Sequence, residues 1–333
     1  MFELFFLLIY DIIYIVWFFI FFILFLKLLF YDGKASEGFN SFQFFNYKIY
    51  FMLLILGLFY CYLFKPVSFW MGFDYLLFND YFSYFFFLFF FLFFFLFLLL
   101  FVNLNEDYFY YYEYLFILML VTLFVGFLFK VFDLMFLFIL VEGLSLCLYI
   151  LVSSNYSSIT IGEASIKYFI LAVLSSLFFL LAICIIYFQY GTFNLMKLKI
   201  FFLSGDNQIS LSFFFACLLL IGSFFFKLGI VPFQLWVVEV YYGVSLSTFF
   251  FLSVYSKYIF FIVLFKLFLN FLLFFNNYFF WIFLISGCLS IFFGIMGSLV
   301  TVDIKKIMAY GSIVHSGFII LCFLNFSYYS IYA

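Results

Sequence analysis

Three ionisable residues, Glu142, Lys227 and Lys257, stand near the middle of long apolar segments. They are unusual in a chain in which only 8% of residues are charged. A charge at the centre of a bilayer costs about 2.5–3.5 kcal/mol on insertion scales, and such residues usually face a bundle interior or a water-filled path. A carboxyl group and two amines in such positions suit proton transfer, which is the chemistry that we expect of them.

Glu142 lies in VFDLMFLFILVEGLSLCLYILV, too far from either end of the segment for a short carboxylate to reach a headgroup. It must therefore be neutral, paired with a cation or in contact with water. The alternative is a structural carboxyl group that hydrogen-bonds a neighbouring helix.

Lys227 lies in GSFFFKLGIVPFQLW, where Gly229 and Pro232 weaken the helix. Proline lacks an N–H, and its ring clashes with the carbonyl four residues back, which frees the Leu228 carbonyl beside the lysine. Broken helices at membrane depth are found where they are buried in protein or line a water-filled cavity. Pro232 therefore predicts a helix break next to a proton-transferring lysine. A lysine that reaches the interface is the alternative.

Lys257 lies near the centre of STFFFLSVYSKYIFFIVLF, from which its amine reaches the interface only with strain. Lys266 and Lys130 are close to segment ends, where we expect their amines to extend to the interface. Glu163 and Lys167 are four residues apart near a segment start, a spacing that favours a local ion pair as much as a transport role.

The only histidine, His315, follows a charged cluster in VDIKKIMAYGSIVHSGF. Histidine titrates near neutral pH, which makes it a candidate proton relay. A structural role is equally open.

The elements that position these residues are expected to be membrane-spanning helices. The chain is 71% hydrophobic with a mean hydropathy of +1.38, unlike soluble domains. A span needs about 20 apolar residues, and its backbone groups must pair internally, so we predict an all-α polytopic membrane protein. The ten expected spans are residues 12–30, 49–66, 82–102, 114–130, 133–153, 165–189, 211–232, 246–268, 279–300 and 306–325, and linkers include 67–81, 190–210 and 233–245.

Charge and cysteine usage exclude several functions. A net charge of −2 with dispersed lysines does not favour nucleic acid as a partner. The six cysteines stand singly, without the paired spacing of a metal or redox site, so we expect no metal and no cofactor on this chain. Abundant Phe, Tyr, Ile and Lys with no Arg suggest an AT-rich, organellar genome. The first residues carry no targeting signal, so we expect insertion at the site of synthesis.

Five stretches in this order resemble the antiporter-like membrane subunits of mitochondrial NADH:ubiquinone oxidoreductase (complex I), in particular the subunit 2 branch. They lie between about residues 133 and 320 and read DLMFLFILVEGLSLCLYIL, EASIKYFILAVLSS, KLGIVPFQLWVVEVYYG, FLSVYSKYIFF and DIKKIMAYGSIVHSGF. The resemblance implies a mitochondrial inner-membrane location, with no NADH, flavin or iron–sulfur site on this chain.

The resemblance also implies roles for the three central charges. Glu142, Lys227 and Lys257 match the family's proton-transfer residues on the fifth, the broken seventh and the eighth spans. Water wires are expected to link them. Quinone reduction elsewhere in the complex is expected to shift the pairing of Glu142 with Lys227, so that Lys227 passes a proton towards Lys257.

The family also implies the domain organisation. Residues 1–110 would hold three helices, 111–268 the first antiporter-like five-helix repeat, and 269–333 the first two helices of an incomplete second inverted repeat. We expect a separate polypeptide to supply the remaining helices, beside lipids and other membrane-arm subunits. Two alternatives remain at this point: a scaffold subunit of the same complex that does not conduct, and a stand-alone cation/proton antiporter.

Overall fold

The computed structural model of the protein describes residues 108–153, 159–203, 211–270 and 276–325, two short strands and a few residues between 83 and 94. The expected spans at 12–30 and 49–66, and most of 82–102, lie outside the described residues.

The described residues are almost entirely helical. The elements are β1 (Trp70–Gly72), β2 (Leu77–Asn79), α4 (Tyr108–Lys130), α5 (Leu134–Ser153), α6 (Ile159–Tyr190), α7 (Leu195–Leu203), α8 (Leu211–Leu228), α9 (Leu235–Gly243), α10 (Leu246–Phe250), the π-helix η2 (Phe251–Ser256), α11 (Lys257–Asn270), α12 (Asn276–Val300), α13 (Ile304–Cys322) and the 3-10 turn η4 (Phe323–Asn325). β1 and β2 form an antiparallel pair within the expected linker 67–81.

Six helical segments within the described part are long and apolar enough to cross a membrane. They are residues 134–153, 160–190, 211–228, 246–270, 279–300 and 304–322. Each matches an expected span within a few residues, and α4 covers the expected span at 114–130. The prediction of an all-α polytopic membrane protein is therefore confirmed for this part of the chain. Its reason is that a helix pairs its own backbone groups wherever an apolar run excludes water.

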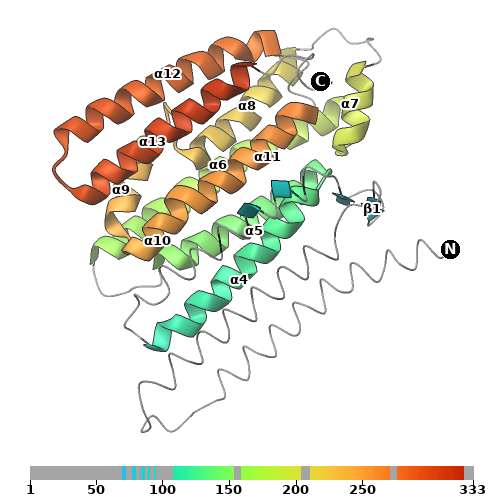
Figure 1. The fold of residues 1–333 in the computed structure, drawn as a ribbon. Coiled ribbons are helices and arrows are strands. Elements are labelled where there is room, and N and C mark those ends of the chain that lie inside the picture. Colours follow the sequence, from blue (N-terminus) through green and yellow to red (C-terminus); the bar gives the residue numbers. More distant parts are fainter. Residues whose placement is uncertain are drawn as a thin grey trace, which may run out of the picture.

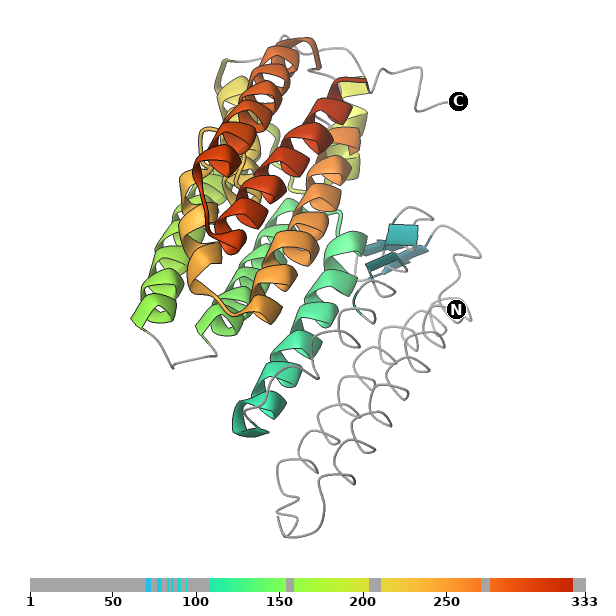
Figure 2. The same ribbon diagram turned by 60° about the vertical axis from the view of Figure 1, so that its left-hand side comes forward.

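The helices form one bundle with α4 on one side and the α12–α13 pair on another (Figure 1). Within it α5 packs against both α4 and α6, α6 packs against α8 and α9, and α13 contacts α9. The two views agree that α12 and α13 lie side by side along their length (Figure 2). Glu142 lies on α5, Lys227 on α8 and Lys257 on α11, and α8 packs against α11 as well as α6.

Two expected linkers contain short helices. The stretch 190–210 holds α7, and 233–245 holds α9. Leu195 and Leu198 of α7 are fully buried, as are Val237 and Val240 of α9. Apolar residues three apart share one face of a helix, and this face docks each segment onto the bundle. These stretches do link the spans, but the sequence analysis did not predict their helices.

Candidate functional site

The expected helix break is present between α8 and α9. Helix α8 ends at Leu228, and α9 begins at Leu235. Gly229 has φ +68°, a left-handed conformation that glycine adopts without steric cost. The Val231–Pro232 peptide bond is cis. The span that was expected to continue to residue 232 therefore stops next to Lys227.

Hydrogen bonds close the broken end of α8. The Gly229 and Ile230 amides donate to the Phe226 and Phe225 carbonyls at 3.2 and 3.0 Å. The Trp236 indole Nε1–H also donates to the Phe226 carbonyl, at 3.0 Å. Because the last carbonyls of a helix have no partner within it, these donors make the break compatible with a buried site.

Lys227 is buried in the last turn of α8, and its Nζ has no hydrogen-bond partner among the described residues. The Nζ lies 5.4 Å from the centroid of the Phe260 ring on α11. That ring and the negative end of the α8 dipole are favourable surroundings for a cation. Neither of them replaces the hydrogen bonds that a lysine makes in water.

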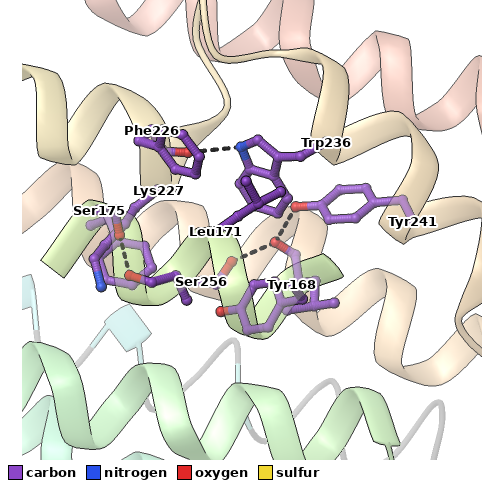
Figure 3. A pocket seen from close by; sticks show the side chains of 11 residues that line it. Tyr168, Leu171, Ser175, Phe226, Lys227, Trp236, Tyr241 and Ser256 are labelled. Atoms are coloured by element: carbon purple, nitrogen blue, oxygen red, sulfur yellow. Dashed lines mark hydrogen bonds between the residues drawn. The ribbon is translucent and has the colours of Figure 1, made fainter. Parts of the chain in front are cut away.

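A small cavity adjoins Lys227. It has about 20 Å³ of space open to the centre of a water molecule, and roughly 10–15 Å³ on this measure is enough for one water. Tyr168, Lys227, Trp236, Tyr241 and Ser256 supply polar atoms or rings to its wall (Figure 3). These residues come from α6, α8, α9 and η2, so the cavity forms where the broken span meets its neighbours.

Glu142 lies on α5, which packs against α6. Its Oε2 is buried and has no hydrogen-bond partner in the described part of the chain. The carboxyl group interacts electrostatically with Lys227 and with Tyr168. The two ion pairs within 4.0 Å among the described residues are Lys167–Glu239 and Lys306–Asp303. Glu142 and Lys227 are therefore coupled through space without direct contact.

Lys257 is buried at the start of α11, directly after η2. Its Nζ donates to the Ser312 carbonyl at 2.8 Å and to the Ser312 hydroxyl at 3.0 Å. Ser312 belongs to α13, so Lys257 points towards α13, whereas the preceding residue, Ser256, lines the cavity at Lys227. π-Helical turns are rare in proteins, but those that occur often lie at functional sites.

His315 lies one turn after Ser312 on α13 and is exposed on the described bundle. It shares a helix with the residue that binds Lys257, but it does not line the cavity. Of the expected set, the structure thus places Lys227 beside the helix break at Pro232 and within electrostatic reach of Glu142. Lys257 directly follows the cavity residue Ser256 in the chain, and His315 is exposed on the described bundle.

The structure corrects one interpretation of the other charges and adds a partner for another. Lys266, expected to reach the interface, is 3% exposed; its Nζ donates to the Phe129 carbonyl at 2.7 Å and lies 4.0 Å from the Phe132 ring centroid. The C-terminal end of α4 offers this carbonyl inside the bundle, and the position of Lys266 along the sequence could not reveal it. Lys167, for which a local pair with Glu163 and a transport role were both open, forms its ion pair with Glu239 of α9 at 2.7 Å.

The sequence interpretation missed the cavity residues Tyr168, Tyr241 and Ser256. The chain has 29 Tyr, many in apolar runs, so a single hydroxyl does not stand out. The one available signal was adjacency, because Tyr168 follows Lys167 and Ser256 precedes Lys257 in stretches already singled out.

A bundle of membrane-length helices with a buried carboxyl group, buried amines and a broken helix defines a polytopic membrane protein with ionisable groups inside the bilayer region. The family profile described as "NADH:quinone oxidoreductase/Mrp antiporter, TM" matches residues 131–333. The chain belongs to this family.

Several curated bacterial proteins are similar to this chain. The chain is 34% identical to NADH-quinone oxidoreductase subunit N of Buchnera aphidicola over 188 residues, which are 56% of this chain and 39% of the relative. It is 32% identical to the subunit N of Ruthia magnifica over 195 residues, 58% of this chain and 40% of that one. The chain thus matches about two fifths of the length of these relatives.

Solved structures show the same fold. A chain of respiratory complex I from Thermus thermophilus superposes with a TM-score of 0.67 at 23% identity, covering 84% of this chain and 59% of that one. A chain of the Mrp complex from Dietzia sp. gives a TM-score of 0.72 at 19% identity, covering 86% and 55%. The comparisons show the family and its fold. They do not single out the mitochondrial subunit 2 branch.

Proposed function

We propose that the protein is a proton-translocating membrane-arm subunit of respiratory complex I, of the subunit 2 branch, in the mitochondrial inner membrane. Family membership and the similarity to NADH-quinone oxidoreductase subunit N support the complex. The composition of the chain, rich in Phe and without Arg, supports the organelle. Electron transfer takes place on other subunits.

The observation that carries the proposal is the pair of buried groups without hydrogen-bond partners among the described residues, Glu142 Oε2 on α5 and Lys227 Nζ on α8. A buried polar group without a partner costs about 1–3 kcal/mol, and more when charged. Buried groups without partners are found at sites where a side chain has to gain and lose a proton. A fully paired ion is stabilised in one protonation state, which would oppose that change.

The direction of transfer follows the order of the residues. A proton that leaves Lys227 can enter the adjoining cavity, whose wall includes Ser256 beside Lys257. Lys257 then faces Ser312 on α13, with His315 one turn beyond as a candidate relay towards the exit. We assign residues 111–268 to the first antiporter-like repeat and 269–333 to the start of the second, after residues 1–110.

The test is Lys227→Met in the intact complex in sealed membrane vesicles, with proton translocation and electron transfer measured together. Translocation per electron transferred should fall, while NADH oxidation by the peripheral arm with an artificial acceptor stays unchanged. Lys197→Met is the matched control, because Lys197 is exposed on α7. Unchanged translocation would favour a scaffold subunit. Cation-driven proton exchange by this chain without NADH would favour an antiporter.

We also propose that a second polypeptide packs its helices on the α12–α13 side. Large apolar side chains of this pair, among them Trp281, Phe292 and Phe318, are exposed on the described bundle. A map of the assembled complex tests this partner. Lipid alone against these side chains would contradict it.

A further inference from the structure

Four hydroxyl groups line the cavity at Lys227, and three of them already donate a hydrogen bond to a backbone carbonyl. Ser175 donates to the Ala172 carbonyl at 2.7 Å. Ser256 and Tyr241 both donate to the Leu252 carbonyl, at 2.6 and 2.9 Å. A hydroxyl has one proton and two lone pairs, so these three present only acceptor positions to the cavity.

Tyr168 on α6 carries the fourth hydroxyl. The residue is 6% exposed and lines the cavity, and its hydroxyl donates to no other described residue. The ring is held in place against Trp236, with 5.9 Å between the centroids. Figure 3 shows this hydroxyl without the hydrogen bonds that occupy those of Tyr241 and Ser256. Tyr168 is therefore the cavity hydroxyl whose proton is available.

The remaining wall offers little other proton chemistry. Leu171, Phe226 and Phe260 contribute apolar side chains, and the Trp236 N–H is taken up by the Phe226 carbonyl. Apart from Lys227, the groups at this cavity that exchange protons readily are thus its hydroxyls.

Tyr168 is also tied to Glu142. Glu142 interacts electrostatically with two residues of the cavity wall, Lys227 and Tyr168. Glu142 has a buried oxygen without a donor, and Tyr168 has a donor without an acceptor. Because no ion pair within 4.0 Å joins Glu142 to Lys227 in the described part of the chain, a proton that passes between them needs an intermediate group.

We propose that Tyr168 is that intermediate, a relay residue that passes protons between the Lys227 cavity and Glu142. This inference rests on the proposed function. The Lys227 ammonium gives a proton to a water in the cavity, and the water gives one of its own to the Tyr168 oxygen. Tyr168 gives its hydroxyl proton, directly or through a second water, to the Glu142 carboxylate. Lys227 ends neutral, Glu142 ends protonated, and water and Tyr168 are regenerated; the reverse transfer runs through the same groups.

The test is Tyr168→Phe in the intact complex, which removes the hydroxyl and keeps the ring against Trp236. Translocation per electron transferred should fall about 10-fold, below the usual range for a positioned acid–base group because water can partly replace the hydroxyl. Tyr187→Phe is the matched control on the same helix, since Tyr187 stacks on Phe193 at 4.2 Å and lies outside the cavity wall. Normal translocation by Tyr168→Phe would overturn the proposal.

A second measurement covers a Tyr168→Phe complex that fails to assemble. Fluorotyrosine incorporated at 168 keeps the hydroxyl and makes it more acidic, so the pH profile of translocation should move to lower pH. Fluorotyrosine at 187 should leave the profile unchanged. If fluorotyrosine at 168 leaves the pH profile of translocation unchanged, the relay role is also overturned. The acidity of a tyrosine that only packs against its neighbours should not affect that profile.

Lys227→Met separates the two proposals. If that variant stops translocation while Tyr168→Phe does not, the relay falls and the proposed function stands. If Lys227→Met translocates normally, the proposed function itself is wrong.

Discussion

Lys257 on α11 reaches across to α13 and donates to both the carbonyl and the hydroxyl of Ser312, at 2.8 and 3.0 Å. The Ser312 hydroxyl in turn donates to the Ala309 carbonyl at 2.7 Å. The amine is therefore held by acceptors only, which suits its protonated form. Lys227, by contrast, has no such acceptors among the described residues. Under the proposed function, this difference suits Lys257 to receive a proton from Lys227.

Ser312→Ala should weaken that receiving position. It removes one acceptor and leaves the backbone carbonyl, and a hydrogen bond to a charged group is worth about 1.5–3 kcal/mol. We expect the rate of translocation to fall about 10-fold, with the complex still assembled. Ser298→Ala is the control, since that hydroxyl bonds its own helix on α12. Equal rates in both variants would show that the carbonyl alone suffices.

Gly229→Ala should disturb the break beside Lys227. Gly229 has φ +68°, and a Cβ there would collide with the Val237 side chain of α9. A left-handed conformation costs a non-glycine residue about 1–2 kcal/mol, so the apparent melting temperature of the complex should fall. Gly222→Ala on α8 is the control, because its Cβ would meet no atom within 4 Å; alanine there should be neutral or stabilising by up to about 1 kcal/mol.

Lys266→Met should lower stability but not translocation, whereas Lys227→Met should lower translocation but not stability. Lys266 loses its bond to the Phe129 carbonyl at the end of α4, so we expect a loss of about 1.5–3 kcal/mol of stability. Translocation per assembled complex should stay unchanged. Lys227→Met breaks no hydrogen bond in the described part, so stability should hold or rise while translocation falls. Thermal unfolding and vesicle assays on both variants check this contrast. Reduced translocation by Lys266→Met per assembled complex would make Lys266 part of the path.

The sequence predicted what depends on local composition. The expected span 133–153 corresponds to α5 at Leu134–Ser153, because a long apolar run has no other way to pair its backbone. The break at Pro232 followed from the missing N–H of proline. The central position of Glu142 and Lys227 in their segments indicated that both are costly to bury.

What the sequence could not predict depends on the packing of distant segments. Lys167 finds Glu239, 72 residues away, because α9 folds back against α6. The cavity needs Tyr168, Lys227 and Ser256 from three separate elements, and no spacing along the chain encodes their meeting. The burial of Lys266 could not be predicted for the same reason, since its acceptor, the Phe129 carbonyl, lies on α4.

Gly317→Ala tests whether the α12–α13 contact positions Lys257. A Cβ on Gly317 would lie 3.0 Å from the Gly287 carbonyl oxygen and would meet the Ser290 hydroxyl. Because backbone cannot move aside as a flexible side chain does, the two helices must separate, at about 1–3 kcal/mol. Gly311→Ala is the control on the same helix, where a Cβ meets no atom within 4 Å.

The separation should also reach the site. Ser312 lies between Gly311 and Gly317 on α13, so a shift of this helix lengthens the bonds from Lys257. We expect Gly317→Ala to lower both the melting temperature and translocation per assembled complex, and Gly311→Ala to lower neither. A loss of stability with normal translocation would mean that Lys257 works without its Ser312 contact, and it would weaken the assignment of Ser312 as the receiving side.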